Sequence, residues 1–419
     1  MQLGSPETLS ASEAVENATS CGLSKPAARG SAAPSHARSA PAWPKFAPDD
    51  GFYAQIRRRV DRYFEITGRK RRDCPRMYVK SAIILAWFAA SYLLLVFGSL
   101  TWWLALPAAF SMALALAGVG FNIQHDGAHG AYSDRRWINR LAGLTLELIG
   151  GSSWAWSRKH NAIHHSFTNV DGYDDDINLG FIARMSPEQK RLSFHRLQHY
   201  YLWVLYGFLT FKWHLYDDFR SVIVGEAGGQ RFPRPRGWDL ATFIVGRGVF
   251  FSLAFVIPML FHPVWIVMLF YALSAYVAGL TLAIVFQLAH CVEEADFPKP
   301  DPATARIENA WAVHQTQTTV DFAPRSRLLS WYVGGLNHQI EHHLFPHICH
   351  VNYAAIARLV MRACRRFGVK YSVNDTLCAA VASHFRWLRR MGMADAAEPA
   401  LQSADVGGAA GRRGRHADS

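Results

Sequence analysis

Four long apolar stretches constrain the fold of this chain more than any other feature of its sequence. They cover about residues 79–100, 102–123, 240–260 and 264–286, and the only charges in them are Lys80, at the very start, and Arg247. Each stretch is close to the roughly 20 residues needed to cross a hydrocarbon core of about 30 Å. Within lipid, backbone groups must bond inside their own segment, so such a stretch has to be helical. The sequence therefore predicts an all-α integral membrane protein with four transmembrane helices.

The short connections between these stretches predict two helical hairpins. Residues 98–103 join the first pair and residues 261–265 the second, and neither connection contains Lys or Arg. Residues 56–80, at and before the start of the first span, carry ten positively charged residues, eight Arg and two Lys. Because positively charged flanks stay on the cytoplasmic side, we expect both termini in the cytoplasm, together with a helical cap formed by the residues outside the spans. The apolar span that follows directly favours a membrane role for this basic segment, so we expect no nucleic acid partner.

We expect a single folded domain, residues 49–390, flanked by two disordered tails. Residues 1–48 are rich in Ala, Ser, Pro and Gly and show no hydrophobic periodicity, and residues 391–419 form the second predicted tail. The six cysteines are scattered without a CxxC pair. Neither a disulfide framework nor a zinc ribbon is therefore indicated.

Eight of the nineteen histidines gather beside the ends of the spans. They form three boxes, HDGAH, HNAIHH and QIEHH, and one more histidine ends the segment FQLAH at the close of the fourth span. On a helix, residues four apart share one face. The predicted metal ligands are His125, His129, His160, His164, His165, His290, His342 and His343, with Gln339 at the start of the third box.

The predicted topology places all of these residues on one side of the membrane. One such pair occurs on helices by chance, whereas three boxes on one side call for a function. Eight imidazoles are too many for one zinc ion, which takes four ligands, and they suit two metal ions with positions left open. Imidazole binds several transition metals, so the spacing alone does not name the metal.

Carboxylates and amides in the same segments are candidates to support the ligands. Histidine ligands usually donate their second N–H to a carboxylate or a carbonyl. Asp126 lies inside the first box, Asp175 in the acidic run DGYDDD after the second, and Glu341 inside the third. Asn337 could hold a metal-bound water, and we expect His314 to support the site rather than bind metal. The acidic run could equally be a solvated loop.

With these motifs the chain resembles the integral-membrane fatty acid desaturases, and among them the front-end (delta-5/delta-6-like) acyl desaturases. The matching segments are GFNIQHDGAHGAYS, WSRKHNAIHHSFTNVDGYDDDI, FQLAHCVEE and WYVGGLNHQIEHHLFPHICHVNY. Gln339, at the first position of the third box, is typical of the front-end type. The resemblance implies a di-iron centre with two Fe ions held by the eight histidines, with Gln339 as ligand or water-holder. It also implies O₂-dependent insertion of a cis double bond into an acyl chain.

The resemblance implies partners as well. These are a linoleoyl-like acyl lipid or acyl-CoA substrate, O₂ and membrane lipids. Many eukaryotic front-end enzymes carry a fused cytochrome b5 domain with an HPGG motif, which this sequence lacks. We therefore expect electrons from an external donor, a carrier of ferredoxin or cytochrome b5 type with its reductase. The expected location is a bacterial inner membrane, with the active site on the cytoplasmic side.

Two other functions fit parts of this pattern. A hydroxylase or ketolase could use the same di-iron scaffold, since the same oxidant can add oxygen to carbon. A zinc-dependent membrane lipid hydrolase also places histidines at span ends, but it needs far fewer of them. Because alkane C–H bonds are not acidic, their removal calls for a metal oxidant rather than an acid–base pair. The attacked carbon, the chain length and the acyl carrier stay open.

Overall fold

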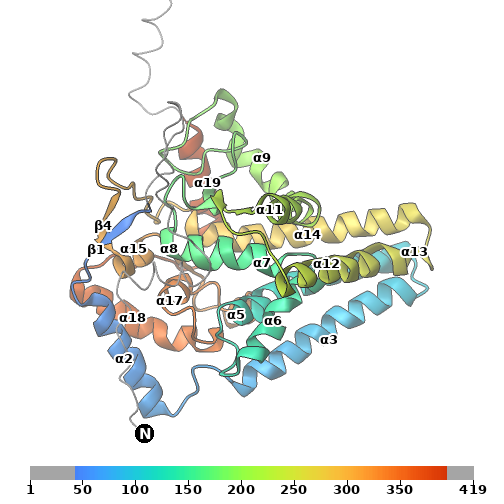
Figure 1. The fold of residues 1–419 in the computed structure, drawn as a ribbon, viewed down its shortest axis with the longest axis horizontal. Helices are drawn as coiled ribbons and strands as arrows, with labels where there is room; N and C mark the ends of the chain where they lie inside the picture. Colours follow the sequence, from blue (N-terminus) through green and yellow to red (C-terminus); the bar gives the residue numbers. More distant parts are fainter. Residues whose placement is uncertain (1–42, 394–419) are drawn as a thin grey trace, which may run out of the picture.

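The computed structural model describes residues 43–393, most of which are helical (Figure 1). Four helices are long and apolar enough to cross a membrane. The first is α3 (Pro75–Phe97) and the fourth is α14 (Val264–His290). The second runs through α4 (Trp102–Val119), the π-helical turn η1 (Gly120–Gln124) and α5 (His125–Ala128). The third runs through α12 (Trp238–Phe251), η7 (Ser252–Val256) and α13 (Ile257–Met259). The predicted helical protein with four candidate spans is confirmed.

The spans extend further than predicted at the ends that carry the histidines. The first begins at Pro75 instead of residue 79, the second continues to Ala128 instead of 123, and the fourth to His290 instead of 286. The prediction ended each span at its first polar residues, but helical backbone bonds continue beyond the apolar segment. Pro75 occupies the first turn of α3, where no backbone donor is needed. Two of the predicted ligands, His125 and His290, therefore lie on the spans themselves.

The remaining helices form a cap that lies mainly at one end of the spans, at the left of Figure 1. Most of them are short, and the chain turns repeatedly between them. They are α2 (Phe52–Thr67), α6 (Arg136–Leu148), α7 (Ser153–Trp156), η2 (Ser157–His164), α8 (His165–Phe167), η3 (Asp175–Ile177), η4 (Ser193–Leu197), α9 (Gln198–Leu205), η5 (Tyr206–Phe208), α10 (Leu209–Lys212), η6 (Trp213–Asp217), α11 (Asp218–Val224), α15 (Trp311–Gln317), α16 (Arg327–Tyr332), α17 (Gln339–Leu344), η8 (His350–Asn352), α18 (Tyr353–Phe367) and α19 (Leu377–Gly392).

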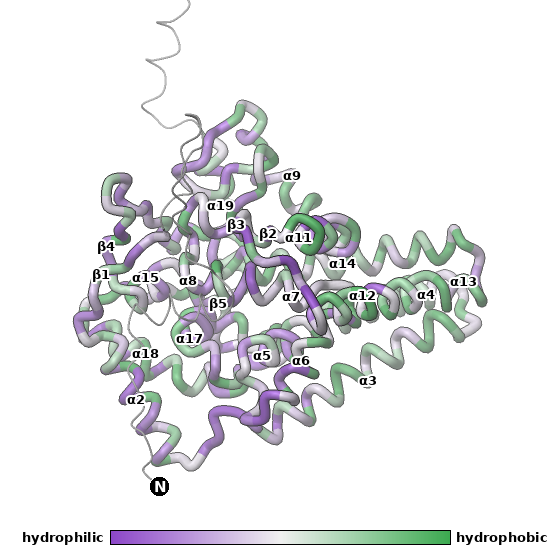
Figure 2. Tube along the Cα trace, in the orientation of Figure 1, coloured by the Kyte–Doolittle hydropathy of each residue, from purple (hydrophilic) through white to green (hydrophobic). Residues whose placement is uncertain are grey.

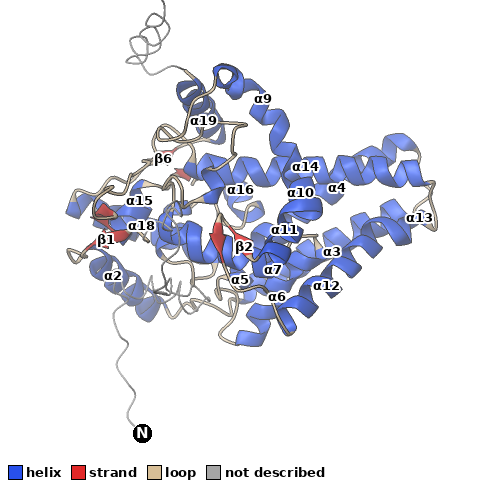
Figure 3. Cartoon of the chain, turned by 45° about the horizontal axis from the view of Figure 1, so that its top comes forward, coloured by secondary structure: helices blue, strands red, loops and turns tan. Residues whose placement is uncertain are grey.

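Three short two-stranded sheets accompany the helices in the described part of the chain (Figure 3). β1 (Lys45–Ala47) pairs in parallel with β4 (Arg306–Ala310), and β5 (Asp321–Phe322) with β6 (Val373–Asn374). β2 (Glu226–Ala227) and β3 (Gln230–Arg231) form an antiparallel pair. Ordered structure thus begins inside the predicted tail of residues 1–48, because β4 supplies a partner strand that the local sequence does not reveal. The rest of the predicted tails, 1–42 and 394–419, lies outside the described residues.

The main hydrophobic core of the cap lies between α2, α17 and α18. α2 buries Phe52, Ile56, Val60 and Phe64, which recur every four residues and so form one apolar stripe. α18 buries its own stripe in the same core, against residues of α17. Since α17 carries the third histidine box, this core fixes the position of that box.

The spans consist mainly of hydrophobic residues, drawn in green in Figure 2. Large side chains such as Leu93, Trp102, Val245 and Leu269 are more than half exposed there. An exposed apolar area of this extent is typical of a membrane-facing surface. The four spans therefore fit integration into a membrane.

Arg247, in the middle of the third span, is buried and paired. Its guanidinium group bonds to the carboxylate of Asp218 in α11 and donates to the carbonyl of Gly150. Charged groups at membrane depth are expensive unless they pair inside the protein. Arg247 therefore ties the third span to the cap.

Candidate metal centre

The first histidine box extends the second span into the cap. His125 and His129 lie about one turn apart, and their ring centroids are 4.7 Å apart. Between them, Gly127 packs so closely on α6 that a Cβ atom there would meet the backbone of Gly143 at 2.4 Å. Glycine is therefore required for α5 to lie against α6. The turn η1 directly before the box is π-helical, a form often found at functional sites.

The second box lies on η2 and the start of α8. A π-helix closes its hydrogen bonds over five residues, so side chains five apart come to lie near one another. The Nε2 atoms of His160 and His165 are 3.3 Å apart. The His160 ring also stacks on Trp156, at 4.2 Å between centroids. All three histidines of this box are buried.

The third box and the end of the fourth span meet the second box. In α17, His342 and His343 are fully buried. The ring of His343 lies 5.0 Å from those of His164 and His290. Gln339 places its side-chain amide 2.9 Å from Nε2 of His290, and its buried carbonyl oxygen has no hydrogen-bond partner among residues 43–393.

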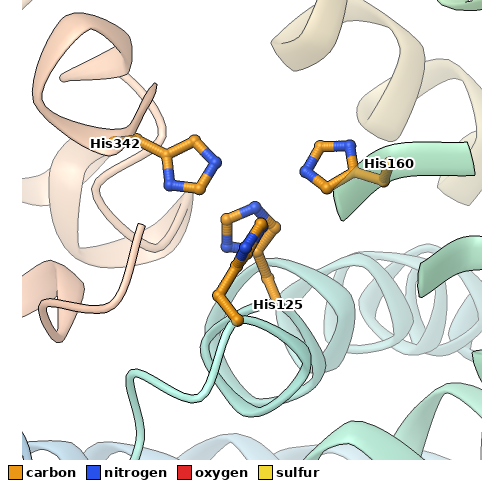
Figure 4. A group of neighbouring side chains, drawn as sticks. His125, His160 and His342 are labelled. Atoms are coloured by element: carbon orange, nitrogen blue, oxygen red, sulfur yellow. The ribbon is translucent and has the colours of Figure 1, made fainter. Parts of the chain in front are cut away.

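Seven of the eight histidines form two adjacent groups, each with ligand atoms within 4.8 Å of one another. Figure 4 shows His125, His160 and His342 pointing toward one another from three separate segments. The first group is His125, His129, His160 and His342, and the second is His164, His290 and His343. His165 lies between them, since its ring is 4.6 Å from that of His342 and 4.2 Å from that of His343.

The unpartnered nitrogens in this cluster fit metal ions. Buried ring nitrogens of His125, His129, His165, His290 and His342 have no hydrogen-bond partner in the described chain. A buried polar group left unpaired costs about 1–3 kcal/mol. Several such nitrogens within one buried cluster would be unfavourable unless positive ions bind there. The donor set therefore suits imidazole-binding transition metals.

The environment also keeps most of these imidazoles in the form that binds metal. Burial, reinforced by neighbouring histidines, holds the pKa of His160, His165, His342 and His343 well below the ordinary 6.5. Metal ligation requires the neutral ring. His164 is the exception: burial lowers its pKa, but the charge and hydrogen bond of Asp174 outweigh burial and raise it.

A carboxylate orients His164. Both oxygens of Asp174 lie 3.1 Å from its Nδ1, and the same oxygens accept the backbone N–H groups of Asn169 and Asp176. Asp175, the residue singled out from the sequence, lies 3.2 Å from the ammonium of Lys159 instead. The sequence could not separate the two, because the turn η3, which decides where each side chain points, begins between them.

Neutral side chains orient the third box, and no sequence motif marks them. Oε1 of Gln315 accepts from Nδ1 of His343 at 2.8 Å, which directs Nε2 toward the metal group. The hydroxyl of Tyr353 lies 3.1 Å from Nδ1 of His342. Gln315 directly follows His314, the residue named from the sequence. His314 itself packs on the Phe46 ring at 5.1 Å, and both its ring nitrogens lack hydrogen-bond partners in the described chain.

Three other predicted supporting residues contact groups outside the ligand set. Asp126 accepts from the backbone and the ring of His350, with 2.9 Å to the ring nitrogen, and its other oxygen is 4.0 Å from His125. Glu341 accepts from the Tyr371 hydroxyl at 3.0 Å. Asn337 donates to Ser330 and to a backbone carbonyl. These hydrogen bonds connect the first and third boxes to neighbouring segments of the cap.

One small apolar cavity adjoins the cluster, and a larger one lies among the spans. The smaller, of about 20 Å³, touches His125 and is lined by residues that include Gly120, Ile149 and Trp156. The larger, of about 360 Å³, reaches from Leu148 to residues beside the far turns. Leu148 and Ile149 are consecutive residues, so the two cavities lie near each other. Sequence patterns did not predict either.

Comparison with known proteins agrees with this geometry. The family model described as "Fatty acid desaturase" matches residues 100–374, more than half of the chain. The chain is 39% identical to the sn-1 linoleoyl-lipid 6-desaturase of Arthrospira platensis, over 83% of this chain and 94% of that protein. It is 36% identical to the protein of the same name from Synechocystis, over 84% and 98%.

A third relative extends the comparison to a eukaryote. The acyl-lipid (8-3)-desaturase of Physcomitrium patens is 37% identical, over 83% of this chain and 73% of that protein. The matched family region contains all three histidine boxes and the histidine that ends the fourth span. This chain therefore belongs to the fatty acid desaturase family.

Proposed function

We propose that this desaturase, an oxidoreductase, inserts a cis double bond into the acyl chain of a membrane lipid, using two iron ions held by the histidine boxes. The observation that carries the proposal is the pair of adjacent, buried imidazole groups beside an apolar cavity. One ion would be held by the first group, the other by the second group, with His165 between them and Gln339 beside His290.

Iron in this setting supplies, together with O₂, an oxidant strong enough to remove hydrogen from unactivated methylene groups. The protein itself would orient the metal ligands and keep water away from the reacting atoms. Asp174, Gln315 and Tyr353 fix the ring orientations of three ligands. Burial of every predicted ligand excludes water from the reacting positions.

The cavities support an orientation for the substrate. The methyl end of the chain would lie in the larger cavity among the spans, and the chain would extend from there toward the smaller cavity beside His125. A volume of about 360 Å³ is within the range of small-molecule sites. The relatives named as linoleoyl-lipid 6-desaturases favour a linoleoyl lipid as substrate and carbon 6 as the position of the new bond.

The finer topology belongs to the proposal as well. The spans would form two hairpins, with both termini, the cap and the metal centre in the cytoplasm and the chain in a bacterial inner membrane. The basic residues before α3 support this orientation. Electrons would come from a separate carrier of ferredoxin or cytochrome b5 type with its reductase.

Expression in a host without polyunsaturated lipids tests the function directly. Cells fed linoleate should accumulate a trienoic acid whose new double bond, located by mass spectrometry, lies at carbon 6. An oxygenated product without new unsaturation would indicate a hydroxylase or ketolase. One zinc and no iron in the purified protein would indicate a hydrolase. No new product despite iron and a competent donor would refute the proposal.

Matched histidine variants connect the activity to the cluster. His342→Ala should abolish the product, because it removes a ligand. His199→Ala, which removes a buried histidine packed on Phe385 at 5.0 Å, should retain it. Equal loss in both variants would point to misfolding and would remove the support for the ligand assignment.

A further inference from the structure

The outer side of α18 forms a basic surface. α18 carries four exposed arginines and no acidic residue, and the neighbouring α2 carries two more exposed arginines, Arg58 and Arg62. Among residues 43–393, no carboxylate pairs with any of these six side chains. We call the four of α18 the basic face: Arg358, Arg362, Arg365 and Arg366.

The basic face points away from the core, because the apolar stripe on the opposite side of α18 enters it. α2 packs against the same core with its own apolar stripe. The acidic residues of α2 weaken the charge only partly. Asp61 lies 2.7 Å from Arg71, and Glu65 is left as the single acidic residue of α2 without such a partner. Asp49 and Asp50 lie just before the first residue of α2, and each accepts a hydrogen bond from a backbone N–H of its first turn.

The inner sides of the same helices reach the metal ligands. Tyr353, in the first turn of α18, bonds to His342 at 3.1 Å. Tyr53 of α2 packs edge-on against Trp311 at 5.5 Å, and the indole N–H of Trp311 donates to the carbonyl of His165 at 3.3 Å. A helix with its side chains is about 10–12 Å across. A protein seated on the basic face is therefore separated from the centre by little more than one helix.

The position of the basic face argues against a lipid partner. Figure 1 shows α2 and α18 at the left end of the molecule, whereas the spans project to the right. The basic segment nearer the membrane is a different one, residues 69–72, which leads into α3. A bilayer crossed by the spans would not cover the outer side of α18. The face is therefore available to a soluble partner.

Desaturation creates the need for such a partner. The reaction removes two hydrogens from the acyl chain, takes up O₂, two electrons and two protons, and forms a double bond and two waters. The acyl chain supplies two of the four electrons that O₂ accepts, and an external reductant must supply the other two. Electron-transfer encounters use small interfaces, and complementary charge steers them.

We infer that the basic face docks an acidic one-electron carrier protein, which delivers the two electrons in successive encounters. The inference rests on the proposed function for the use of these electrons. The carrier would sit over the outer side of α18, and Tyr353 on the inner side of the same helix would lie between it and His342.

Charge reversal on the full-length protein in zwitterionic nanodiscs tests this docking. The test variant is the triple Arg358→Glu, Arg362→Glu, Arg365→Glu. The control reverses three exposed cations elsewhere on the cap, Lys190→Glu, Arg196→Glu and Arg389→Glu, with the same change in net charge. The probes are an acidic plant-type ferredoxin and a soluble cytochrome b5, with affinity measured directly at low and high salt.

We expect the test variant to bind at least one of the carriers about 10-fold or more weakly at low salt and to lose most of its salt dependence. The control should bind as the wild type does, and the triple Arg→Lys variant at the test positions should keep its affinity. Iron content and dithionite-driven single turnover, which need no carrier, check that the metal centre is intact.

Several outcomes would overturn the inference. They are an unchanged affinity for both carriers, an equal loss in the control, and weaker binding to anionic vesicles with carrier affinity unaltered, which would make the face a lipid surface. Carrier binding does not require turnover. A protein that binds the carrier through this face but forms no unsaturated product would therefore refute the proposed function and leave the docking surface in place.

Discussion

Replacing Asp174 by Asn tests how the centre holds its second metal. The Asp174 carboxylate accepts hydrogen bonds from three donors. They are Nδ1 of His164, at 3.1 Å from both oxygens, and two backbone N–H groups. An Asn side chain of the same size offers only one oxygen for these three donors, and it removes the charge. The His164 ring would lose its fixed orientation and part of its basicity.

The expected loss of iron affinity depends on which carboxylates remain beside the His164 ring. Loss of a residue that orients a metal ligand typically costs 10–100-fold in metal affinity. Asp176 lies 3.4 Å from the same nitrogen and is shared with Lys159, so one carboxylate stays close. We therefore expect the lower part of that range, about 10–30-fold, which corresponds to about 1.4–2 kcal/mol.

The assay measures retained iron against rising chelator concentration, with Asp175→Asn as the matched control. Asp175 is the neighbouring aspartate whose partner is Lys159, so its variant should lose iron at the wild-type chelator concentration. The Asp174 variant should lose about one of two irons at roughly 10-fold less chelator. Wild-type retention in the Asp174 variant, or equal loss in both, would refute the assigned role.

Three further predictions concern the third box, the larger cavity and pH. Gln315→Leu removes the acceptor 2.8 Å from His343, and iron content at limiting metal should fall about 10-fold, measured by elemental analysis. Ala254→Phe fills part of the larger cavity, so product profiles should shift toward shorter acyl chains with iron content unchanged; an unchanged preference would contradict the placement of the chain. Because burial lowers the pKa of His160 and His342 below 6.5, these rings of the first group stay neutral as the pH falls through that value. The iron of the first group should therefore be retained at about pH 6, and loss of both irons with a midpoint near 6.5 would contradict this reasoning.

The histidine boxes could be recognised from sequence because their spacing is local. Residues four or five apart on one helix lie close together whatever the rest of the chain does, as His125 with His129 and His160 with His165 show. The supporting residues were harder to identify. Gln315 reaches its histidine across 28 positions, and no local pattern marks it.

The sequence by itself determined the helical membrane class, the four spans and the identity of the histidines, since these depend on hydropathy and on spacing within one segment. Only the tertiary structure decided which histidines share a group, because the three boxes and His290 come from four separate segments that packing brings together. It also decided that Asp174 and not Asp175 faces His164, and that a cavity lies among the spans. The physical reason is that hydrogen-bond partners and cavities depend on how side chains from distant segments meet.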